Sequence, residues 1–501
     1  MTSSMPEISD QTRPNQAGET GGADGLRSNA LGTSDLVFIV VSAAAPLMLM
    51  VGIAPLAIMV GGIGAPSAYA FAGIALAIFA VGFTTMSRHI AGAGAFYSYI
   101  AVGLGRTAGV VSALVALVSY NALQIGVYGL AGVTIQGTFL EVFGINQPWW
   151  VYALSCVAIV WYVGFRSVAF GAKFLAVLLT AETALLLILA VAILVQGGGS
   201  EGLGVESFAP DHMFVPPMTV VLPVAFAAFM GFEATVIYRS ETRNPRRTIP
   251  RATYIGVAVL AGTYAFVVWS IIQAFGAGGA VDAATKHGVE MFFVAGESYL
   301  GGWFTTAMHL LMATSVVASL VAFHNTITRY SLAIADEGLL PAALAKVHPR
   351  TRAPYVAGLA QTALAVVIVS GFALAQADPY TQFMIWVNTP GVFGILLLQV
   401  AAAISVIAYF RRRTTGEGAW RTVVAPVIAA ALMLVAMVLS ARNISFLTGT
   451  TGLVNQVLLM TIPATCAVGF GWAVWLRRNH REVFDAITAD CDTAGEPETV
   501  Q

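Results

Sequence analysis

The sequence predicts an all-α polytopic membrane protein with twelve transmembrane helices. Of its 501 residues, 58% are hydrophobic and only 10% are charged, whereas about a quarter of the residues are charged in typical soluble domains. Twelve apolar runs reach the roughly 20 residues that a helix needs to cross the core of a bilayer. They lack the period-two alternation of the strands in a membrane β-barrel, and they are much longer than such strands.

The twelve runs follow one another along the chain with short polar segments between them. In order, they cover residues 36–60, 66–87, 107–138, 148–169, 171–196, 215–238, 251–276, 302–330, 354–376, 380–410, 421–441 and 452–476. Residues 1–35 are polar, rich in Gly, Ser, Thr and Asn, and lack the apolar core of a signal peptide. We therefore expect a disordered cytoplasmic tail there, and a similar tail at 477–501.

The positions of the basic residues predict the orientation of the chain. With a cytoplasmic N-terminus and twelve crossings, all but two of the 24 Lys and Arg residues fall on the cytoplasmic side or at adjoining helix ends. The exceptions are Lys286 and Arg442. Cytoplasmic loops of membrane proteins carry such an excess of positive charge. Both termini are therefore expected in the cytoplasm, and the cytoplasmic (plasma) membrane is the predicted location.

Enzyme and metal chemistry find no support in the sequence. Cys156, Cys466 and Cys491 have no spacing that suggests a disulfide framework or a metal site. Motifs of zinc proteases, serine hydrolases and phosphate-binding loops are absent. The segment GAGGAVDAATKHG after the seventh run is expected to be only a Gly-rich external loop. No cofactor and no nucleic-acid partner are predicted.

Two acidic residues, Glu182 and Glu233, lie within apolar runs, whereas the other acids lie in tails, loops or run ends. An ionised carboxylate at the centre of a bilayer costs at least about 2.5 kcal/mol. Each of the two must therefore face protein or water, or hold a proton or a cation. A neutral acid that hydrogen-bonds a neighbouring helix is the structural alternative to a role in transport.

Proline and glycine interrupt two of the runs near their middles. The first run contains SAAAPLMLMVGIAPLA, with Pro46, Gly52 and Pro55, and the sixth contains Pro223 and Gly231. A proline inside a helix costs about 3 kcal/mol because it removes a backbone donor and clashes with the preceding turn. Non-helical backbone persists at membrane depth only where protein buries it or where it lines a wet cavity. A simple kink is the alternative for either run alone, but two interruptions favour broken helices at a binding site.

The two interrupted runs each begin a half of five runs. Interruptions at corresponding positions point to the substrate site of an inverted-repeat transporter. The free N–H groups at a half-helix N-terminus suit a carboxylate, and exposed carbonyl groups suit an ammonium or a metal cation. One gap can therefore hold both ends of an amino acid.

Three motifs resemble those of the amino acid, polyamine and organocation (APC) superfamily, in the same order and spacing. TTMSRHIAGAGAFYSYIAVGLGR at 84–106 is similar to the loop between its second and third helices. FMGFEATVIYRSETRNPRRTIPRA at 229–252 is similar to its sixth helix and the following loop. Residues 319–341, ending in ADEGLLP, resemble its eighth helix and loop. The resemblance covers residues 33–410.

The resemblance implies the leucine-transporter fold, with a five-plus-five inverted repeat and discontinuous helices 1 and 6. Helices 1–5 would form the first repeat at 36–196, and helices 6–10 the second at 215–410. Helices 11 and 12 would follow at 421–476. It also implies secondary active transport of amino acids or their amines by alternating access.

By similarity, the substrate lies between the breaks of the first and sixth helices, with selectivity residues from the third helix and an aromatic gate from the eighth. The candidate binding residues are Ala44, Ala45, Pro46, Leu47, Gln124, Tyr128, Ala227, Ala228, Phe229, Gly231 and Phe323. Members of the family typically have a G-x-G-like turn in the first helix, where this chain has S-A-A-A-P, so the register of the carboxylate-binding amides stays open. Ordinary helix packing is the alternative for Phe323.

By the same similarity, Glu182 takes the place of a lysine that some proton-coupled members carry in the fifth helix, near the cation site of sodium-coupled relatives. An acid there would hold a proton or a cation. The candidate coupling residues are Glu182, Glu233, Ser315, Ser319 and His324. The serines would supply hydroxyls to a sodium site, and a packed histidine is the alternative for His324. Proton coupling is favoured over sodium.

The leading prediction is a permease that moves amino acids across the lipid bilayer by alternating access with proton coupling. An exchanger of an amino acid for its decarboxylated amine is the alternative within transport, and it needs no coupling ion. A non-transporting sensor or channel is the alternative of another class, although a channel should show rings of charge and a sensor a soluble output domain. The candidate pocket residues are mostly small and apolar, so a neutral or modestly polar amino acid is the favoured substrate.

Overall fold

The computed structural model describes residues 31–90, 95–166, 172–237, 242–413 and 415–487. Within these residues the chain is helical, and the strand-like pairing is limited to an isolated bridge between Leu31 and Thr242. Residues 1–30 and 488–501 of the predicted tails lie outside the described residues, whereas residues 481–486 form a short helix with Phe484 buried, which differs from the disorder expected there.

The helices alternate between long apolar rods and short connecting pieces. Their bounds in chain order are Thr33–Ala44 for α1, Pro46–Gly61 for α2, Ala65–Met86 for α3, Ala95–Leu104 for α4, Arg106–Phe143 for α5, Trp149–Phe165 for α6, Ala172–Val195 for α7, Pro210–Met213 for α8, Met218–Ala227 for α9, Ala234–Ile237 for α10, Pro245–Phe275 for α11, Ala280–His287 for α12, Met291–Leu300 for α13, Gly302–Asp336 for α14, Tyr355–Leu374 for α15, Ile385–Arg412 for α16, Ala425–Arg442 for α17, Ile444–Thr448 for α18, Leu453–Asn479 for α19 and Arg481–Ala486 for α20. Three short segments named below are η1 at Gly62–Gly64, η4 at Gly288–Glu290 and η6 at Pro379–Met384.

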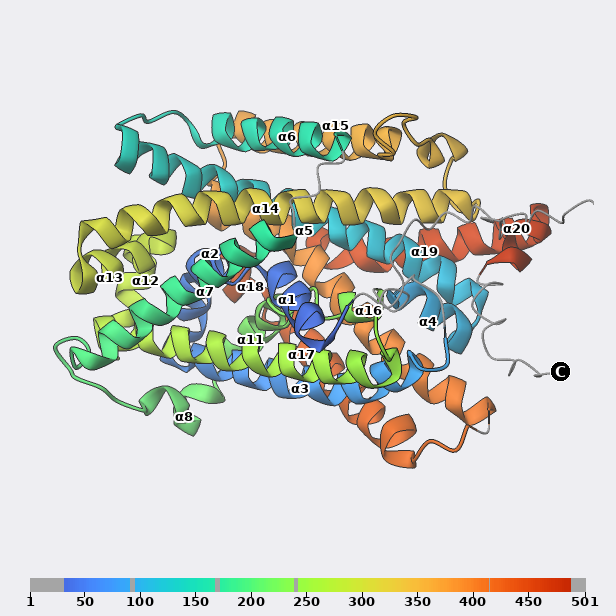
Figure 1. Cartoon of the computed structure of the whole chain (residues 1–501), viewed down its shortest axis with the longest axis horizontal. Coiled ribbons are helices and arrows are strands. Elements are labelled where there is room, and N and C mark those ends of the chain that lie inside the picture. Colours follow the sequence, from blue (N-terminus) through green and yellow to red (C-terminus); the bar gives the residue numbers. More distant parts are fainter. Residues whose placement is uncertain (1–30, 91–94, 167–171, 238–241, 414, 488–501) are drawn as a thin grey trace, which may run out of the picture.

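Most of the long helices lie roughly along the long axis of the molecule (Figure 1). Nine helical stretches among the described residues are long and apolar enough to cross a membrane, and α6 and α9 are shorter apolar helices. The class of an all-α polytopic membrane protein is thereby confirmed. Each of the twelve predicted runs contains a helix, but nine stretches do not establish twelve crossings. The number of crossings and the two five-helix repeats stay predictions.

The first predicted run is interrupted at Ala45. Helix α1 ends at Ala44 and α2 begins at Pro46, and Ala45 between them has φ 42° and ψ 70°, in the left-handed region. The residue before a proline is disfavoured in right-handed helical backbone, and proline is well suited to the first position of a helix. The pair Ala45-Pro46 therefore ends one helix and starts another. Pro55, by contrast, lies inside α2 without ending it.

A buried hydrogen bond ties α2 to the segment before α16. The Tyr380 hydroxyl in η6 donates to the Gly52 carbonyl oxygen at 2.9 Å. One residue earlier, the Val51 carbonyl lacks its usual helical donor because Pro55 has no N–H. Two elements distant in sequence are thus fixed to each other where the hydrogen-bond ladder of α2 is incomplete.

The sixth predicted run is interrupted over residues 228–233. Helix α9 ends at Ala227 and α10 begins at Ala234, and turns occupy the residues between them. Gly231 has φ 104°, a conformation that glycine adopts without steric cost. Pro223 lies inside α9, so the interruption falls at the glycine rather than at the proline. The expected discontinuity is present in both runs.

The Gly-rich segment after α11 forms helices, which corrects the expectation of a plain loop. Helices α12 and α13 follow each other there through η4. Ala280 and Ala284, one turn apart, are buried, and α12 contacts α2. Because this packed face consists of small alanines rather than large apolar side chains, the sequence carries little sign of it.

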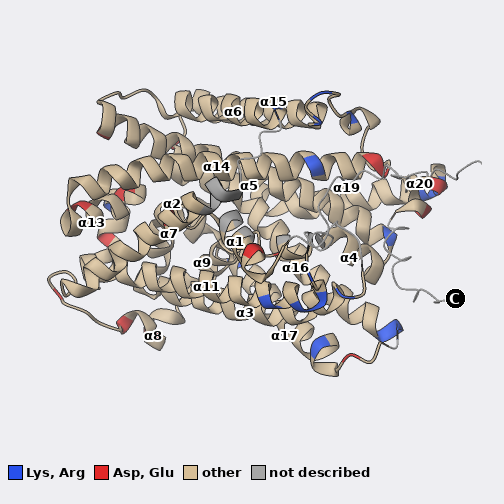
Figure 2. Cartoon of the chain, in the orientation of Figure 1, with Lys and Arg blue, Asp and Glu red and all other residues tan. Residues whose placement is uncertain are grey.

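Basic residues gather at one end of the molecule. Figure 2 shows Lys and Arg mostly toward the end where α4 and α20 lie, whereas the opposite end, near α8 and α13, carries mainly Asp and Glu. The Arg243 N–H, just before α11, donates to the Leu31 carbonyl oxygen at 2.8 Å. The orientation of the two termini relative to a membrane stays a prediction.

The G-x-G at the end of the motif at 84–106 serves close helix packing. A β-carbon at Gly103 of α4 would stand 2.5 Å from the Ser405 carbonyl oxygen of α16. Gly105, with φ 100°, joins α4 to α5. Small residues at such contacts let helix backbones approach closely in membranes. Residues 91–94 of the same motif lie outside the described residues.

We expect Gly103→Ala to lower the thermal unfolding midpoint of the protein in detergent. The clashing neighbour is a backbone atom that cannot move aside easily, and overpacking of this kind costs about 1–3 kcal/mol. Gly262→Ala in α11 is the matched control, because a β-carbon there meets open space. Equal midpoints for Gly103→Ala and the wild-type protein would show that α4 and α16 do not pack this closely.

Candidate functional site

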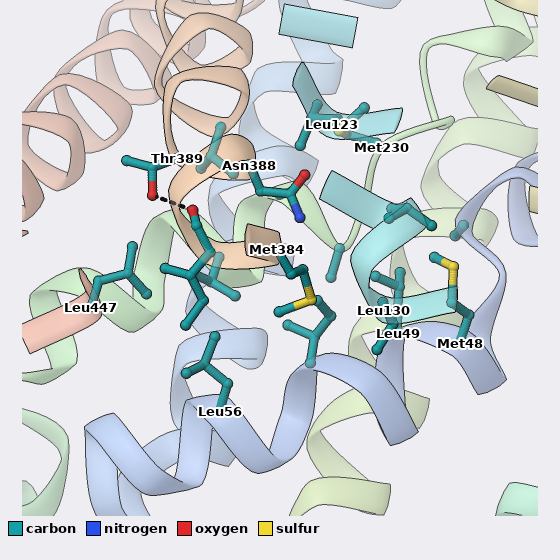
Figure 3. Close-up of a pocket in the computed structure, with 18 of the residues that line it drawn as sticks. Met48, Leu49, Leu56, Leu123, Leu130, Met230, Met384, Asn388, Thr389 and Leu447 are labelled. Carbon is teal, nitrogen blue, oxygen red and sulfur yellow. Dashed lines mark hydrogen bonds between the residues drawn. The ribbon is translucent and has the colours of Figure 1, made fainter. Parts of the chain in front are cut away.

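The two helix breaks meet at a cavity inside the bundle (Figure 3). Ala44 and Met48 line it on either side of the first break, and Ala228 and Met230 line it from the second. The cavity has a volume of about 90 Å³. Since one water molecule needs roughly 10–15 Å³ of such volume, this space can hold a solute larger than one water molecule.

Helices α5, α14, α16 and α18, together with the segment η6, complete the wall. The face of α5 that lines the cavity carries Leu123, Val127 and Leu130. Phe323 comes from α14, Met384 from η6, and Asn388 and Thr389 from α16. The last two supply the polar side chains of the wall, and no acidic or basic side chain of the described residues lines it.

The backbone at the first break is suited to an anionic group. The Leu49 N–H donates to the Ala45 carbonyl oxygen at 3.1 Å and closes the first turn of α2. The N–H groups of Leu47 and Met48 precede it in this turn, where a helix offers no carbonyl of its own. The positive end of the α2 dipole lies at the same place. A carboxylate fits this arrangement without any charged side chain.

Glu233 lies at the second break and hydrogen-bonds its backbone, and it does not line the cavity. Its carboxylate accepts hydrogen bonds from the Gly231 N–H at 2.9 Å and from the Tyr120 hydroxyl at 3.1 Å. The side chain is 6% exposed. Glu233 therefore satisfies a backbone donor in the turn and joins this turn to α5. Its part in ion coupling stays a prediction.

Glu182 is a residue of α7, and its side chain meets α14 and does not line the cavity. The Ser315 hydroxyl donates to its carboxylate at 2.9 Å, and Glu182 is 3% exposed. Helix α7 also contacts α1 and α2. The carboxyl group is thus on a helix that touches both halves of the broken first span.

Glu290 is an acid outside the apolar runs whose protonation changes near neutral pH. Burial raises the pKa of Glu290 to about 7, and the charge of Glu141 adds to the effect. The segment that carries it, η4, contacts α2. Glu290 therefore changes protonation closer to neutral pH than an ordinary glutamate does.

The structure brings four of the predicted binding residues to the cavity, namely Ala44, Ala227, Ala228 and Phe323. Ala45, Pro46 and Leu47 form the first break beside it, and Gly231 lies in the second. The expected register of the first break is therefore close to the observed one.

Gln124 and Tyr128 lie on another face of α5. The Gln124 Nε2 group donates to the Leu320 carbonyl oxygen at 3.1 Å, and its amide oxygen accepts a hydrogen bond from Gln361 of α15. Tyr128 is 2% exposed and lies within hydrogen-bond reach of Gln124. The structure shows no contact of either side chain with the cavity, and their part in selectivity stays a prediction.

Three other candidates are packed between helices. Phe229 meets Tyr264 edge-on, with ring centroids 5.7 Å apart. His324 fills the space over Gly164 of α6, where a β-carbon would stand 2.8 Å from its Nε2 atom. Ser319 is buried on α14. The position of His324 agrees with the packing alternative, and its part in coupling stays a prediction.

Sequence reasoning missed most of the cavity wall. Met48, Met230 and Met384 reach the cavity from three separate elements, and nothing in a single sequence marks a methionine as a wall residue. The apolar residues of α5 recur at helical spacing, which identifies a face but not its partner. Asn388 precedes Pro390 inside α16, and this polar residue beside a proline in the tenth run is the signal that would have found it.

Comparison with known proteins places the chain in a family. The sequence profile described as amino acid permease matches residues 31–470. The low-affinity putrescine importer PlaP of Escherichia coli (strain K12) is 24% identical over 359 residues, which cover 69% of this chain and 73% of that protein. The branched-chain amino acid permease BcaP of Bacillus subtilis (strain 168) is 32% identical over 135 residues, which cover 27% of this chain and 28% of that protein.

A third relative is the L-methionine/branched-chain amino acid exporter YjeH of Escherichia coli (strain K12). It is 31% identical over 186 residues, which cover 36% of this chain and 42% of that protein. The family match spans most of the chain and includes both breaks. The chain therefore belongs to the amino acid permease family, and it is a membrane transporter rather than an enzyme.

Proposed function

We propose that the chain carries a small neutral amino acid across the plasma membrane by alternating access, with proton coupling. The observation that carries this proposal is the meeting of two helix breaks at one cavity. The N-terminus of α2 offers N–H groups to the substrate carboxylate, and the C-terminal end of α9, with its negative dipole end, suits the ammonium. The basic end of the molecule faces the cytoplasm under the positive-inside rule.

The chemistry of the cavity favours a neutral substrate over a diamine. Burying a cation without a compensating charge is costly, and no acidic side chain of the described residues lines the cavity. The relatives are named for putrescine, for branched-chain amino acids and for methionine, so their names alone do not select one class. The apolar wall, with its three methionines and the apolar face of α5, fits the neutral side chain of an amino acid.

We place proton coupling at Glu182. The ionised form of a carboxyl buried at membrane depth is costly, so proton binding and release change the free energy of packing α7 against α14. Because α7 also contacts α1 and α2, this change acts on the helix that holds the substrate. A sodium-coupled mechanism and an amino acid/amine exchange remain as distinct outcomes of the following test.

Uptake into liposomes that contain the purified protein tests the proposal. Labelled neutral amino acids, basic amino acids and putrescine are offered with and without a pH or a sodium gradient. We expect saturable accumulation of neutral amino acids that follows an inward proton gradient and ignores sodium. Accumulation of putrescine alone would contradict the substrate class, and counterflow without any gradient dependence would favour exchange. Absence of flux for every compound would favour a non-transporting sensor.

We expect Pro46→Ala to weaken substrate binding. Alanine supplies an N–H and allows a continuous helix through residue 45, which removes the free end of α2. A tenfold rise in the KM of uptake, equivalent to about 1.4 kcal/mol, is the expected size. Ala45→Gly is the matched control, because glycine keeps the left-handed conformation at no steric cost and should preserve KM. Unchanged affinity in Pro46→Ala would show that the break does not bind the substrate.

We expect Glu182→Gln to retain counterflow but to lose accumulation driven by the pH gradient. Glutamine keeps the size of the side chain and still accepts the Ser315 hydrogen bond, but it cannot release a proton. Glu290→Gln is the matched control, since Glu290 changes protonation near neutral pH outside the cavity and its replacement should leave the accumulation ratio intact. If Glu182→Gln accumulates substrate like the wild-type protein at every external pH, Glu182 has no part in coupling.

A further inference from the structure

Asn388 differs from every other side chain that lines the cavity. The amide oxygen of Asn388 is buried and has no hydrogen-bond partner among the described residues. Thr389, the other polar side chain of the wall, is satisfied, because its hydroxyl donates to the Ile385 carbonyl oxygen of its own helix at 2.7 Å. Buried polar groups in proteins are nearly always paired, and each exception calls for an explanation.

Close packing holds the Asn388 amide in place. A β-carbon at Gly126 of α5 would stand 2.8 Å from the Nδ2 atom and would also clash with the amide oxygen. The absence of a side chain at Gly126 therefore makes room for the amide between α5 and α16. The amide oxygen therefore lies against α5, while Figure 3 shows the amide nitrogen pointing toward Met384 in the cavity wall.

The amide lies across the cavity from the substrate-binding end of α2. Figure 3 shows Asn388 on the ribbon of α16, across the cavity from Leu49 in the first turn of α2. A zwitterion whose carboxylate meets the first turn of α2 presents its side chain toward the opposite wall. The Asn388 amide is thus placed to meet the side chain of the substrate and not its backbone.

We propose that Asn388 is a specificity-determining residue that selects neutral amino acids with a hydroxyl or a carboxamide in the side chain. The inference rests on the proposed function and names the substrate class of the same site. Hydroxyl and carboxamide groups both carry an oxygen that accepts a hydrogen bond, so either pairs with the Nδ2 N–H of Asn388. An aliphatic substrate of the same shape leaves the amide unpaired, and sites built around a hydrogen bond reject such analogues strongly.

The test compares isosteric substrates in the same liposomes. Uptake of labelled Thr is divided by that of Val, and uptake of Asn by that of Leu. Differences between variants in expression and assembly then cancel in each ratio. We expect the wild-type protein to favour the polar member of each pair by about tenfold or more. Asn388→Leu, of similar shape, is expected to bring both ratios to about one. Ser405→Ala, also on α16, is the matched control and is expected to keep the wild-type ratios, because Ser405 does not line the cavity and its hydroxyl is bonded within its own helix.

Each outcome decides the proposal. A wild-type protein that takes up Val as well as Thr overturns it. Equal loss of all four substrates in Asn388→Leu also overturns it, since the amide would then bind the part that all amino acids share. If Asn388→Leu does not assemble, the same two uptake ratios are measured in Asn388→Ala and in Gly126→Ala. Ratios that equal those of the wild-type protein in both variants overturn the proposal. Failure of the proposed function is distinguishable, because the wild-type protein would then take up none of the four amino acids.

Discussion

Backbone groups inside a bilayer must find partners within the protein or in a cavity that admits polar groups, and this requirement organises the molecule. The two helix breaks satisfy this requirement in different ways. At the second break, short turn bonds and the Glu233 carboxylate satisfy the N–H groups of residues 228–232. At the first break, Pro46 has no N–H and the N–H groups of Leu47 and Met48 begin a new helix beside a cavity. The N–H groups of the second break thus find partners within the protein, whereas those of the first lie at the start of a helix next to the cavity.

Helix α5 connects this site to the surrounding helices. One of its faces lines the cavity with apolar side chains, while Gln124 on another face bonds to α14 and α15. The Tyr120 hydroxyl on the same helix reaches Glu233 in the second break. Helix α5 also makes extensive contact with α16, which carries Asn388. Helix α5 therefore joins one wall of the cavity to the second break and to the helices around it.

Much of the fold and part of the site follow from the sequence. Charge and hydropathy predict the apolar helices, and proline and glycine predict both breaks, because the conformational limits of these residues are local. Pro55 and Pro223 show the limit of this reasoning, since both lie inside continuous helices and their neighbours determine that outcome. The rotation of a helix about its axis is set by all its contacts together. Gln124 and Leu123 are adjacent in sequence, yet only Leu123 lines the cavity, and no local pattern distinguishes them.

The hydrogen bond from Tyr380 to Gly52 has a consequence for the way this side of the cavity opens. Leu56 of α2 and Met384 of η6 line the cavity on either side of that bond. Moving the two elements apart leaves the Tyr380 hydroxyl and the Gly52 carbonyl without a hydrogen-bond partner, and hydrocarbon cannot replace either partner. Water can take over both, so separating α2 from η6 costs least where water enters between them. A lipid tail supplies neither a donor nor an acceptor, so the same separation toward hydrocarbon leaves both groups unpaired.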